Sequence, residues 1–468
     1  MAPAGRSDLQ ARDRAAFWHP CGQMRDYDDF PPLEIVGAAG ARLRLADGGE
    51  VLDAISSWWC KALGHGHPRL RAALRAQADA FEHVITANTT SAPLVRLCER
   101  LLAAANGAPA RDWASDAAPG RRDGHFGKVF LADNGSTAVE IALKLALQAQ
   151  AQRGRPARTR FAALANGYHG ETVGALSVGD NDLYGAPYRA LMFPVTKLAG
   201  LPYRSGPEDP RWMDAGAEWP AIERALDAEA DTLAAVIYEP VLQAAGEMRL
   251  YSPDLLRRLR RWADAHDVYL IADEIAAGMG RLGAILASHL PAAALPDFAT
   301  LSKGLTGGVL PLSAVLTTDA VAALFEGEWA SGRAFLHSNT YTGNALGVAV
   351  ANAVLDVFAA EDVLGRVSAQ GPALRRALAA LVAGRPDLPF ADARGCGMVA
   401  AVDLRGPGGA PLDPRRRTGY RVYREAVRRG VLLRPIGDTM YLFPPLNVEA
   451  ADVERMVAVL EQSVAAAV

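Results

Sequence analysis

Short apolar runs alternate with longer amphipathic stretches through the middle of the chain. An apolar run of four or five residues between turn residues is typical of a buried strand, whereas the longer stretches have the period of a helix. Strands that alternate with helices indicate a mainly parallel sheet covered by helices on both faces. We predict strands at 129–131, 160–164, 234–238, 268–272 and 298–301, and helices at 137–152, 253–266 and 344–359.

The two ends of the chain follow a different pattern. Near the start, short runs predict a hairpin, and the turn Gly64-His65-Gly66-His67-Pro68 predicts the beginning of a helix. From about Ala360 onward, helical stretches mix with short strands, which indicates a second, α+β domain. The hairpin is predicted at 33–36 and 41–45, the helix at 69–82, and the later elements at 415–429, 431–434 and 440–443.

One stretch breaks the alternation. Residues 106–127 are rich in Ala, Pro, Gly, Asp and Arg and show neither the helical nor the strand period. Connecting loops have this composition. We therefore expect a mobile insertion between a helix and the first strand of the large sheet.

The size and charge of the chain favour a metabolic enzyme. With 468 residues, 50% of them hydrophobic, the chain can bury a large core as one large unit plus a smaller one. The formal net charge of −3 gives no indication of nucleic-acid binding. Two arginine-rich clusters, 257–261 and 415–417, are short, and we interpret them as solvated faces.

The sequence favours a cytoplasmic location. No run approaches about eighteen apolar residues without a charge, so we expect no membrane span. Residues 1–14 lack an apolar core and are not expected to be a secretory signal. The four cysteines share no CxxC spacing, which predicts neither a disulfide framework nor a metal site and favours a reducing compartment. They are Cys21, Cys60, Cys98 and Cys396.

The strongest chemical signal is a lysine that follows a strand ending in an acid. The apolar run 268–271 leads to Asp273, and Lys303 lies further on in Ser302-Lys303-Gly304. Pyridoxal phosphate chemistry needs both groups, because a lysine amine forms a Schiff base with the cofactor and an acid keeps the pyridine nitrogen protonated. A surface lysine is the usual interpretation of a lone Ser-Lys-Gly, but the acid at this spacing argues against it.

A series of short motifs runs along most of the chain. They are Trp18-His19-Pro20, Ser56-Ser57-Trp58-Trp59, Gly64-His65-Gly66-His67-Pro68, Asp133-Asn134-Gly135-Ser136, Asn166-Gly167-Tyr168-His169-Gly170, Tyr238-Glu239-Pro240, Asp273-Glu274-Ile275, Ser302-Lys303-Gly304 and Gly343-Asn344. With these motifs, the chain resembles the class III aminotransferases of fold type I from about residue 17 to about residue 445. The acid, lysine and glycine-serine motifs are shared by the whole class, whereas the first two motifs resemble those of the members that act in biotin biosynthesis.

The resemblance implies the architecture of the whole chain. It predicts a large domain with a mainly parallel sheet flanked by helices, plus a smaller, discontinuous α+β domain. We place the N-terminal segment of the small domain at 1–75, the large cofactor-binding domain at 76–345 and the C-terminal small domain at 346–468. The resemblance also implies a homodimer with shared active sites.

The resemblance implies where the ring of pyridoxal phosphate is bound. Lys303 is the expected catalytic residue and carries the cofactor. Asp273 pairs with the pyridine nitrogen, and Glu239 supports it from nearby. Tyr168 stacks on the ring and faces the substrate, although a buried aromatic residue in a turn is the alternative.

The phosphate is expected at a helix start. Gly135 and Ser136 lie between a strand and a helix, so their N–H and hydroxyl groups can face an anion. An ordinary helix N-cap is the alternative interpretation of these residues. Asn339 and Thr340 match the family loop that reaches over from the neighbouring subunit to complete the phosphate site.

The resemblance also implies a substrate-binding set. Trp58 matches a tryptophan that contacts substrate, and Trp59 follows it; a tryptophan pair in the core is the alternative. Arg434 is a lone cation after an apolar strand, and its guanidinium fork suits a substrate carboxylate. Cys21 and Ser338 occupy the other substrate-facing positions of the family.

Some positions depart from the familiar pattern of the family. Cys21 stands where a tyrosine is usual, Glu171 where an aspartate is usual, and Ser338-Asn339 where Gly-Pro is usual. These departures bear on recognition of the amino donor more than on the reaction. Arg281 matches a further family arginine, which we interpret as structural.

The implied reaction is ping-pong amino transfer between a small-molecule amino donor and a keto acceptor. For the biotin branch the acceptor is 8-amino-7-oxononanoate and the usual donor is S-adenosylmethionine, with lysine as an alternative donor. Three other classes stay open: an ω-amino acid:pyruvate transaminase, a different pyridoxal phosphate enzyme such as an aminomutase or decarboxylase, and a non-catalytic binding protein.

Overall fold

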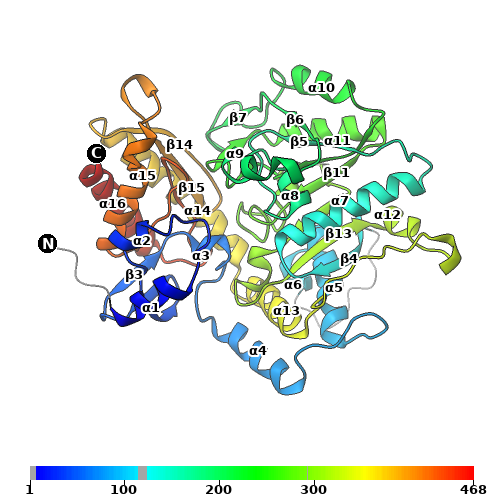
Figure 1. Cartoon of the computed structure of the whole chain (residues 1–468), viewed down its shortest axis with the longest axis horizontal. Coiled ribbons are helices and arrows are strands. Elements are labelled where there is room, and N and C mark those ends of the chain that lie inside the picture. The colour runs from blue at the N-terminus through cyan, green and yellow to red at the C-terminus, as the bar shows by residue number, and fades with distance from the viewer. Residues whose placement is uncertain (1–6, 114–123, 292–293) are drawn as a thin grey trace.

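A seven-stranded sheet forms the centre of the larger part of the molecule (Figure 1). The computed structural model describes residues 7–113, 124–291 and 294–468. Only β13 runs antiparallel to its neighbours, and the other pairings in the sheet are parallel, which confirms the predicted mainly parallel sheet. The strand order is β4 (Phe126–Ala132), β13 (Ser313–Thr318), β12 (Phe298–Leu301), β11 (Tyr269–Asp273), β8 (Leu233–Tyr238), β5 (Arg160–Leu164) and β6 (Thr196–Leu198).

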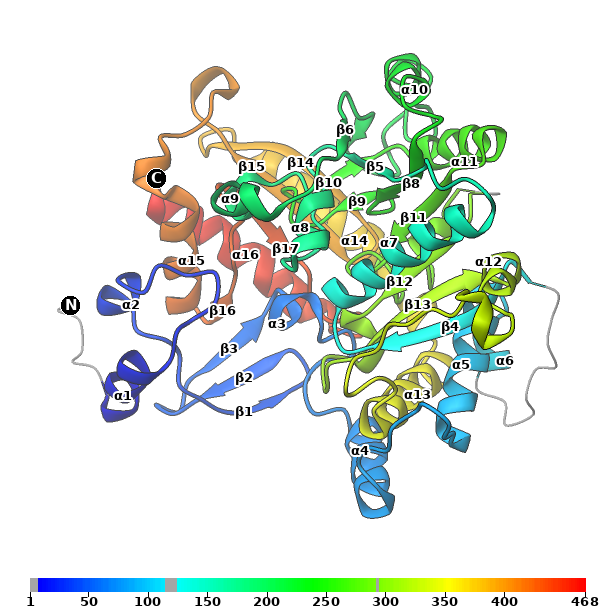
Figure 2. The ribbon, with the colours of Figure 1, turned by 45° about the vertical axis from the view of Figure 1, so that its right-hand side comes forward.

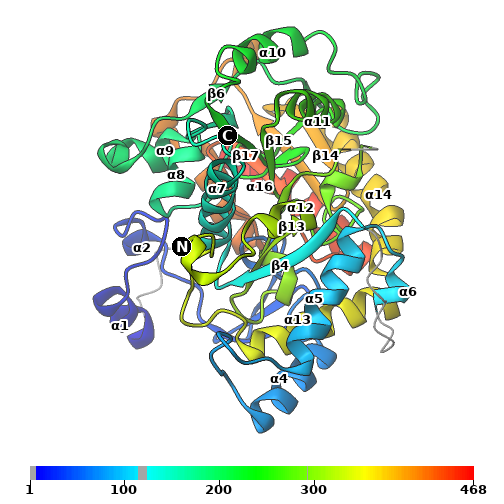
Figure 3. The same ribbon diagram turned by 90° about the vertical axis from the view of Figure 1, so that its right-hand side faces the viewer.

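Helices cover both faces of this sheet because successive strand residues point to opposite sides. Ile237 and Ile271 pack in the core beneath α7 (Gly135–Gln152). Val236 and Leu270, their neighbours in sequence, pack in the core that contains α10 (Trp219–Asp227) and α11 (Asp254–His266). In Figure 3, α7 crosses one side of β4, and α5 (Ala92–Ala105) and α13 (Ala345–Ala360) lie on the other.

The two ends of the chain meet in a second, smaller part (Figure 2). β16 (Val431–Leu432) pairs in parallel with β3 (Glu50–Asp53), so the N-terminal hairpin and the C-terminal region share one sheet. The hairpin consists of β1 (Ile35–Ala39) and β2 (Arg42–Leu45). A separate antiparallel sheet contains β14 (Phe390–Cys396), β15 (Val399–Leu404) and β17 (Thr439–Leu442), and the accompanying helices are α14 (Val363–Gly384), α15 (Thr418–Arg428) and α16 (Ala450–Ala467).

Shorter elements connect these layers. The limits 1–75, 76–345 and 346–468 remain predictions. Over the described ranges, no helix is both long and apolar enough to cross a membrane. The remaining α-helices of the described residues are α1 (Asp8–Ala16), α2 (Asp26–Asp29), α3 (Ser56–Trp59), α4 (Pro68–Ala80), α6 (Ala110–Trp113), α8 (Val173–Val178), α9 (Asp182–Gly185) and α12 (Asp319–Leu324), and the remaining strands are β7 (Tyr203–Arg204), β9 (Leu242–Gln243) and β10 (Arg249–Tyr251).

The stretch 106–127 is only partly the loose insertion that its composition predicts. Residues 114–123 lie outside the described residues. Before them, α6 forms a short helix, and the Trp113 side chain is 2% exposed. The Trp113 carbonyl accepts a hydrogen bond from the buried Arg100 guanidinium, and its indole N–H donates to the Ala108 carbonyl at 2.6 Å. The prediction of mobility is therefore wrong for 110–113, because the Trp113 side chain packs in the core.

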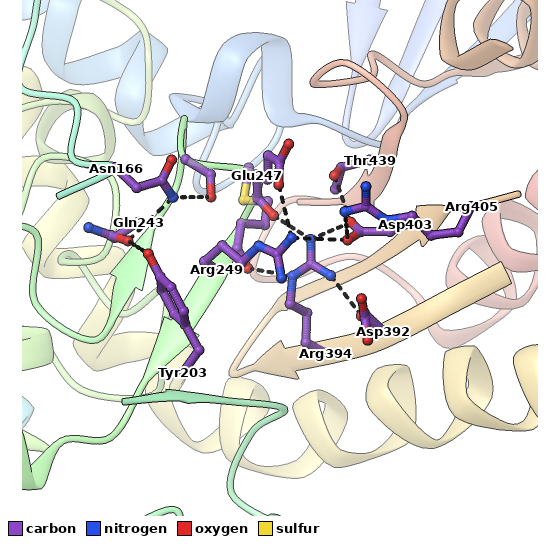
Figure 4. A network of polar contacts seen from close by, with 12 residues as sticks. Asn166, Tyr203, Gln243, Glu247, Arg249, Asp392, Arg394, Asp403, Arg405 and Thr439 are labelled. Atoms are coloured by element: carbon purple, nitrogen blue, oxygen red, sulfur yellow. Dashed lines mark hydrogen bonds and ion pairs between the residues drawn. The ribbon is translucent and has the colours of Figure 1, made fainter. Parts of the chain in front are cut away.

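A buried polar network joins the two parts of the molecule (Figure 4). The Asp403 carboxylate on β15 accepts from Arg394 at 2.7 Å, from Thr439 at 2.7 Å and from Arg249 of β10 at 3.2 Å. Arg394 also donates to the Glu247 carbonyl at 2.6 Å. The small antiparallel sheet is thereby tied to the loop that follows β9.

We expect Arg394→Met to lower the free energy of unfolding by about 3 kcal/mol, because the nearly fully buried Asp403 would lose its best partner. Urea unfolding followed by circular dichroism measures the change. Arg415→Met is the matched control, because Arg415 is 90% exposed and its partner Asp413 lies at the surface. An unchanged urea midpoint in Arg394→Met would show that this network does not stabilise the fold.

Candidate active site

A cavity of about 410 Å³ opens where β11 and β12 end and α7 begins. Ligands of open α/β sheets bind in this place, beyond the carboxyl ends of the parallel strands. The N-terminal segment forms part of its wall through Pro20 and Cys21. The other lining residues are Trp58, Trp59, Asn134, Gly135, Ser136, Tyr168, His169, Gly170, Glu171, Glu239, Asp273, Ile275, Ala276, Ser302 and Lys303.

The parallel pairing of β11 with β12 brings Lys303 and Asp273 to one site. Asp273 lies in register with Thr300, so the acid that ends one strand and the lysine that follows the other both face the cavity. Desolvation lowers the pKa of Lys303, and the negative charges of Asp273 and Glu239 oppose this shift. A lysine with a lowered pKa is more often neutral, and a neutral amine is the nucleophilic form.

Asp273 is fixed by three hydrogen-bond donors. Its carboxylate lies 2.8 Å from His169 Nδ1, and it accepts from the Ile275 N–H at 3.1 Å and from the Thr300 hydroxyl at 3.3 Å. The side chain of Asp273 is only 4% exposed. This contact gives His169 a function that the sequence analysis did not assign, although the residue stands inside the motif Gly167-Tyr168-His169-Gly170.

Glu239 links the turn that contains Tyr168 to the segment that contains Ala244. Its carboxylate accepts from the Tyr168 N–H at 2.9 Å and from the Ala244 N–H at 3.0 Å. Burial, and then the negative charge of Asp273, raise the pKa of Glu239 to about 8. The residue thus holds the backbone of Tyr168 in place beside the cavity.

The Tyr168 ring forms one wall of the cavity, and two of the unusual residues lie beside it. The Tyr168 hydroxyl donates to Glu171 at 2.9 Å, and the Cys21 sulfur lies 4.0 Å from the same carboxylate. Burial, followed by the charge of Glu171, raises the pKa of the Cys21 thiol. Cys21 and Glu171, both departures from the family pattern, therefore form one cluster.

The N-terminus of α7 forms another side of the cavity. Asn134 caps this 18-residue helix by accepting from the Thr137 N–H at 3.1 Å, and Gly135 and Ser136 line the cavity. Gly170 approaches so closely, with φ +123°, that a Cβ there would lie 2.1 Å from the Ser136 oxygen. The N-cap interpretation and the anion-site interpretation are compatible, because a capped helix still directs free N–H groups outward.

The tryptophan pair divides into a buried and an accessible member. Trp59 is 6% exposed, and the Lys303 amine lies 5.1 Å from the centre of its ring. Trp58 is 39% exposed, and the Arg434 guanidinium lies 4.2 Å from its ring centre. Arg434 also donates to the Cys21 carbonyl at 3.1 Å, which places it at the edge of the cavity.

The predicted loop residues Ser338, Asn339 and Thr340 do not line this cavity. Ser338 and Thr340 are exposed, and the Thr340 carbonyl lies 2.9 Å from His83 Nε2. Arg281 is buried and donates to the Pro444 carbonyl at 2.6 Å, in keeping with a structural role. Within one chain, the cavity is therefore lined by every predicted site residue except those of the loop 338–340 and Arg434. Arg434 lies at the edge of the cavity.

A family model described as aminotransferase class III matches residues 23–464. The chain belongs to the class III aminotransferases. This class III aminotransferase is 37% identical to the adenosylmethionine-8-amino-7-oxononanoate aminotransferase of Geobacter sulfurreducens, over 97% of each chain. It is 39% identical to the enzyme of the same name from Nitratidesulfovibrio vulgaris, over 96% of this chain and 80% of the relative.

Solved structures agree with the family. The crystal structure of adenosylmethionine-8-amino-7-oxononanoate aminotransferase from Methanocaldococcus jannaschii has a TM-score of 0.86 at 30% identity and covers 98% of this chain and 99% of its own. An amine transaminase from an uncultivated Pseudomonas species, in its PLP-bound form, has a TM-score of 0.85 at 33% identity over 97% and 99%. The predicted family and fold type are confirmed.

Pyridoxal phosphate is the cofactor of this class III aminotransferase. The residues present fit the cofactor, because one cavity combines a lysine with a lowered pKa, a buried carboxylate and a helix N-terminus. A volume of about 410 Å³ lies within the range of small-molecule sites. Among the described residues, no group of three or more His, Cys, Asp or Glu side chains is arranged to hold a metal ion.

Proposed function

We propose that this aminotransferase converts 8-amino-7-oxononanoate to 7,8-diaminononanoate, with S-adenosylmethionine as amino donor, in the cytoplasm. The observation that carries the acceptor assignment is the stack of Arg434 on Trp58 at the edge of the cavity. A cation beside an accessible aromatic face suits a chain with an apolar middle and a terminal carboxylate. The names of the relatives at 37% and 39% identity support the same substrate.

Each cavity residue has a proposed task. Bound pyridoxal phosphate supplies an electron sink for the carbon that gains or loses the amino group. Lys303 binds the cofactor and moves the proton at that carbon. Asp273, held by His169, keeps the pyridine nitrogen protonated. Tyr168 covers the ring, and the Gly135 and Ser136 N–H groups receive the phosphate.

We also propose a homodimer in which the loop 338–340 completes the phosphate site of the partner. In this chain Ser338 and Thr340 are exposed, and the loop does not line the cavity. Large apolar side chains near it also face solvent, among them Leu336 at 76%, Tyr341 at 58% and Ile85 at 64% exposure. Exposed apolar groups that gather in this way mark protein interfaces. Analytical ultracentrifugation that finds a monomer under assay conditions would contradict this proposal.

A second candidate function is amination of simple ketones, because the PLP-bound relative at 33% identity is an amine transaminase. A panel of acceptors and donors separates the two. We expect turnover of 8-amino-7-oxononanoate with S-adenosylmethionine or, failing that, with lysine. Turnover of pyruvate with simple ω-amines, together with failure to complement a strain that cannot make diaminononanoate, would favour the second candidate.

We expect Arg434→Ala to reduce kcat/KM for 8-amino-7-oxononanoate by about tenfold, because a partly exposed charge pair contributes about 1–2 kcal/mol. A fully buried pair would cost more, but Arg434 retains contact with solvent. Trp58→Ala should reduce the same quantity through lost apolar contact. Steady-state kinetics with varied acceptor measures both effects. Arg434→Lys is the control that keeps the charge. An unchanged kcat/KM in Arg434→Ala would show that this residue does not belong to the acceptor site.

A further inference from the structure

Both tryptophans stand on a turn with an unfavourable backbone. Four consecutive residues, Ser56 to Trp59, have positive φ angles of 49°, 45°, 69° and 74°. A non-glycine residue in this left-handed region costs about 1–2 kcal/mol. Such a turn persists only where surrounding groups hold it.

The group that holds the turn is the carboxylate of Asp53, at the end of β3. One oxygen accepts from the Ser57 N–H at 2.9 Å and from the Ile55 N–H at 3.3 Å. The other accepts from the Ser57 hydroxyl at 2.7 Å and lies 2.9 Å from His65 Nε2. Asp53 is fully buried, at 0% exposure, so its carboxylate depends on these hydrogen bonds in place of water.

His65 is itself fixed by the backbone. Its N–H donates to the Gly40 carbonyl at 2.7 Å, and its carbonyl accepts from the Gly40 N–H at 3.0 Å. The motif Gly64-His65-Gly66-His67-Pro68 thereby anchors the imidazole against the hairpin of β1 and β2. The Ser57 hydroxyl also lies 3.4 Å from His65 Nε2, the same ring nitrogen that contacts Asp53. Because one nitrogen meets both partners, the imidazole cannot relay a proton from Ser57 to Asp53 through its two nitrogens, as a nucleophile, base and acid in series require.

The turn has a definite consequence for the cavity. It directs Trp59 inward, where its indole N–H donates to the Tyr441 hydroxyl at 3.1 Å and its ring faces the Lys303 amine. It directs Trp58 outward, against Arg434. A right-handed turn at Ser57 would change the direction of the Trp58 side chain and remove it from the guanidinium.

We propose that Asp53, together with His65, is a positioning residue for substrate binding, and that it acts by holding the left-handed turn that sets Trp58 against Arg434. The inference rests on the proposed function in one respect, namely that Trp58 contacts the acceptor. Asp53 does not line the cavity, so its effect on the acceptor must pass through the turn.

A double-mutant cycle tests the inference. Asp53→Asn keeps the shape of the side chain but has one acceptor oxygen fewer for the four groups around it. We expect it to raise KM for 8-amino-7-oxononanoate and lower kcat/KM about tenfold, with a small change in kcat. In the Trp58→Ala background, Asp53→Asn should lower kcat/KM by less than about twofold, because the residue through which it acts is gone.

Asp47→Asn is the matched control. Asp47 also accepts a backbone hydrogen bond near the end of a strand of the same sheet, from the Gly49 N–H at 2.9 Å, but its side chain is exposed and does not line the cavity. It should leave kcat/KM unchanged in both backgrounds. An equal loss from Asp53→Asn in the presence and absence of Trp58 would overturn the proposal, because a general structural defect does not depend on Trp58.

A crystal structure of Asp53→Asn gives a readout that is independent of activity. We expect the Ser57 φ to leave the left-handed region and Trp58 to leave Arg434; an unchanged turn overturns the proposal. If Trp58→Ala alone has parent kinetics, the proposed contact of Trp58 with the acceptor fails, whereas the structure still decides whether Asp53 holds the turn. Should Asp53→Asn fail to fold, Ser57→Ala removes one of the four bonds and enters the same cycle and crystallography, with the same outcomes.

Discussion

Lys303→Ala is expected to abolish amino transfer while the fold stays intact. The lysine is the residue whose lowered pKa and position in the cavity suit both attachment of the cofactor and movement of the proton. Loss of a positioned general base alone costs on the order of 10²- to 10⁴-fold in rate, and here the point of covalent attachment is lost as well. Steady-state turnover with saturating donor and acceptor measures the effect.

Two further measurements make the Lys303 result specific. Borohydride treatment followed by mass spectrometry should attach the cofactor to the parent protein and leave Lys303→Ala unlabelled. Lys61→Ala is the matched control, since the Lys61 amine donates to the Gly308 carbonyl at 2.8 Å and does not line the cavity. It should still be labelled. Turnover of Lys303→Ala at the parent rate would refute the assignment of the site.

Asp273→Asn is expected to lose turnover on the order of 10²-fold or more, because a fixed charge opposite the reacting group is removed. Asparagine has nearly the same shape and still accepts hydrogen bonds from the Ile275 N–H and the Thr300 hydroxyl. It carries no negative charge, so it cannot keep a pyridine nitrogen protonated. Attachment of the cofactor to Lys303 should survive, and borohydride labelling checks this.

Glu274→Gln is the neighbouring control for Asp273→Asn. Glu274 is also fully buried, and its carboxylate accepts from the Ala287 and Ser288 N–H groups at 2.7 Å and 2.8 Å. It does not line the cavity, so its replacement should change stability more than kcat. If Asp273→Asn retained near-parent turnover, another group would have to protonate the cofactor.

The central sheet and the proximity of Asp273 to Lys303 could be predicted from the sequence because local patterns report them. Runs of apolar residues mark strands that are buried on both faces, and amphipathic stretches mark the helices that cover them. Parallel strands end at one edge of the sheet, so an acid that ends one strand and a lysine that follows the next one must lie near each other. Asp273 and Lys303 are found together for this reason.

The tertiary structure alone decided how the residues of the site are held in place. The bond from Arg434 to Cys21 spans 413 positions of the chain, and no local period reports a contact of that separation. The left-handed turn at Ser56–Trp59 contradicts the backbone preference of its own residues, and we attribute it to the buried Asp53 carboxylate, which accepts from the Ser57 N–H and the Ser57 hydroxyl. The motif that contains His169 did not predict a role for this residue, and only the fold brings its Nδ1 atom to 2.8 Å from the Asp273 carboxylate. Local sequence patterns determine which elements form, whereas the contacts between distant elements depend on how those elements pack.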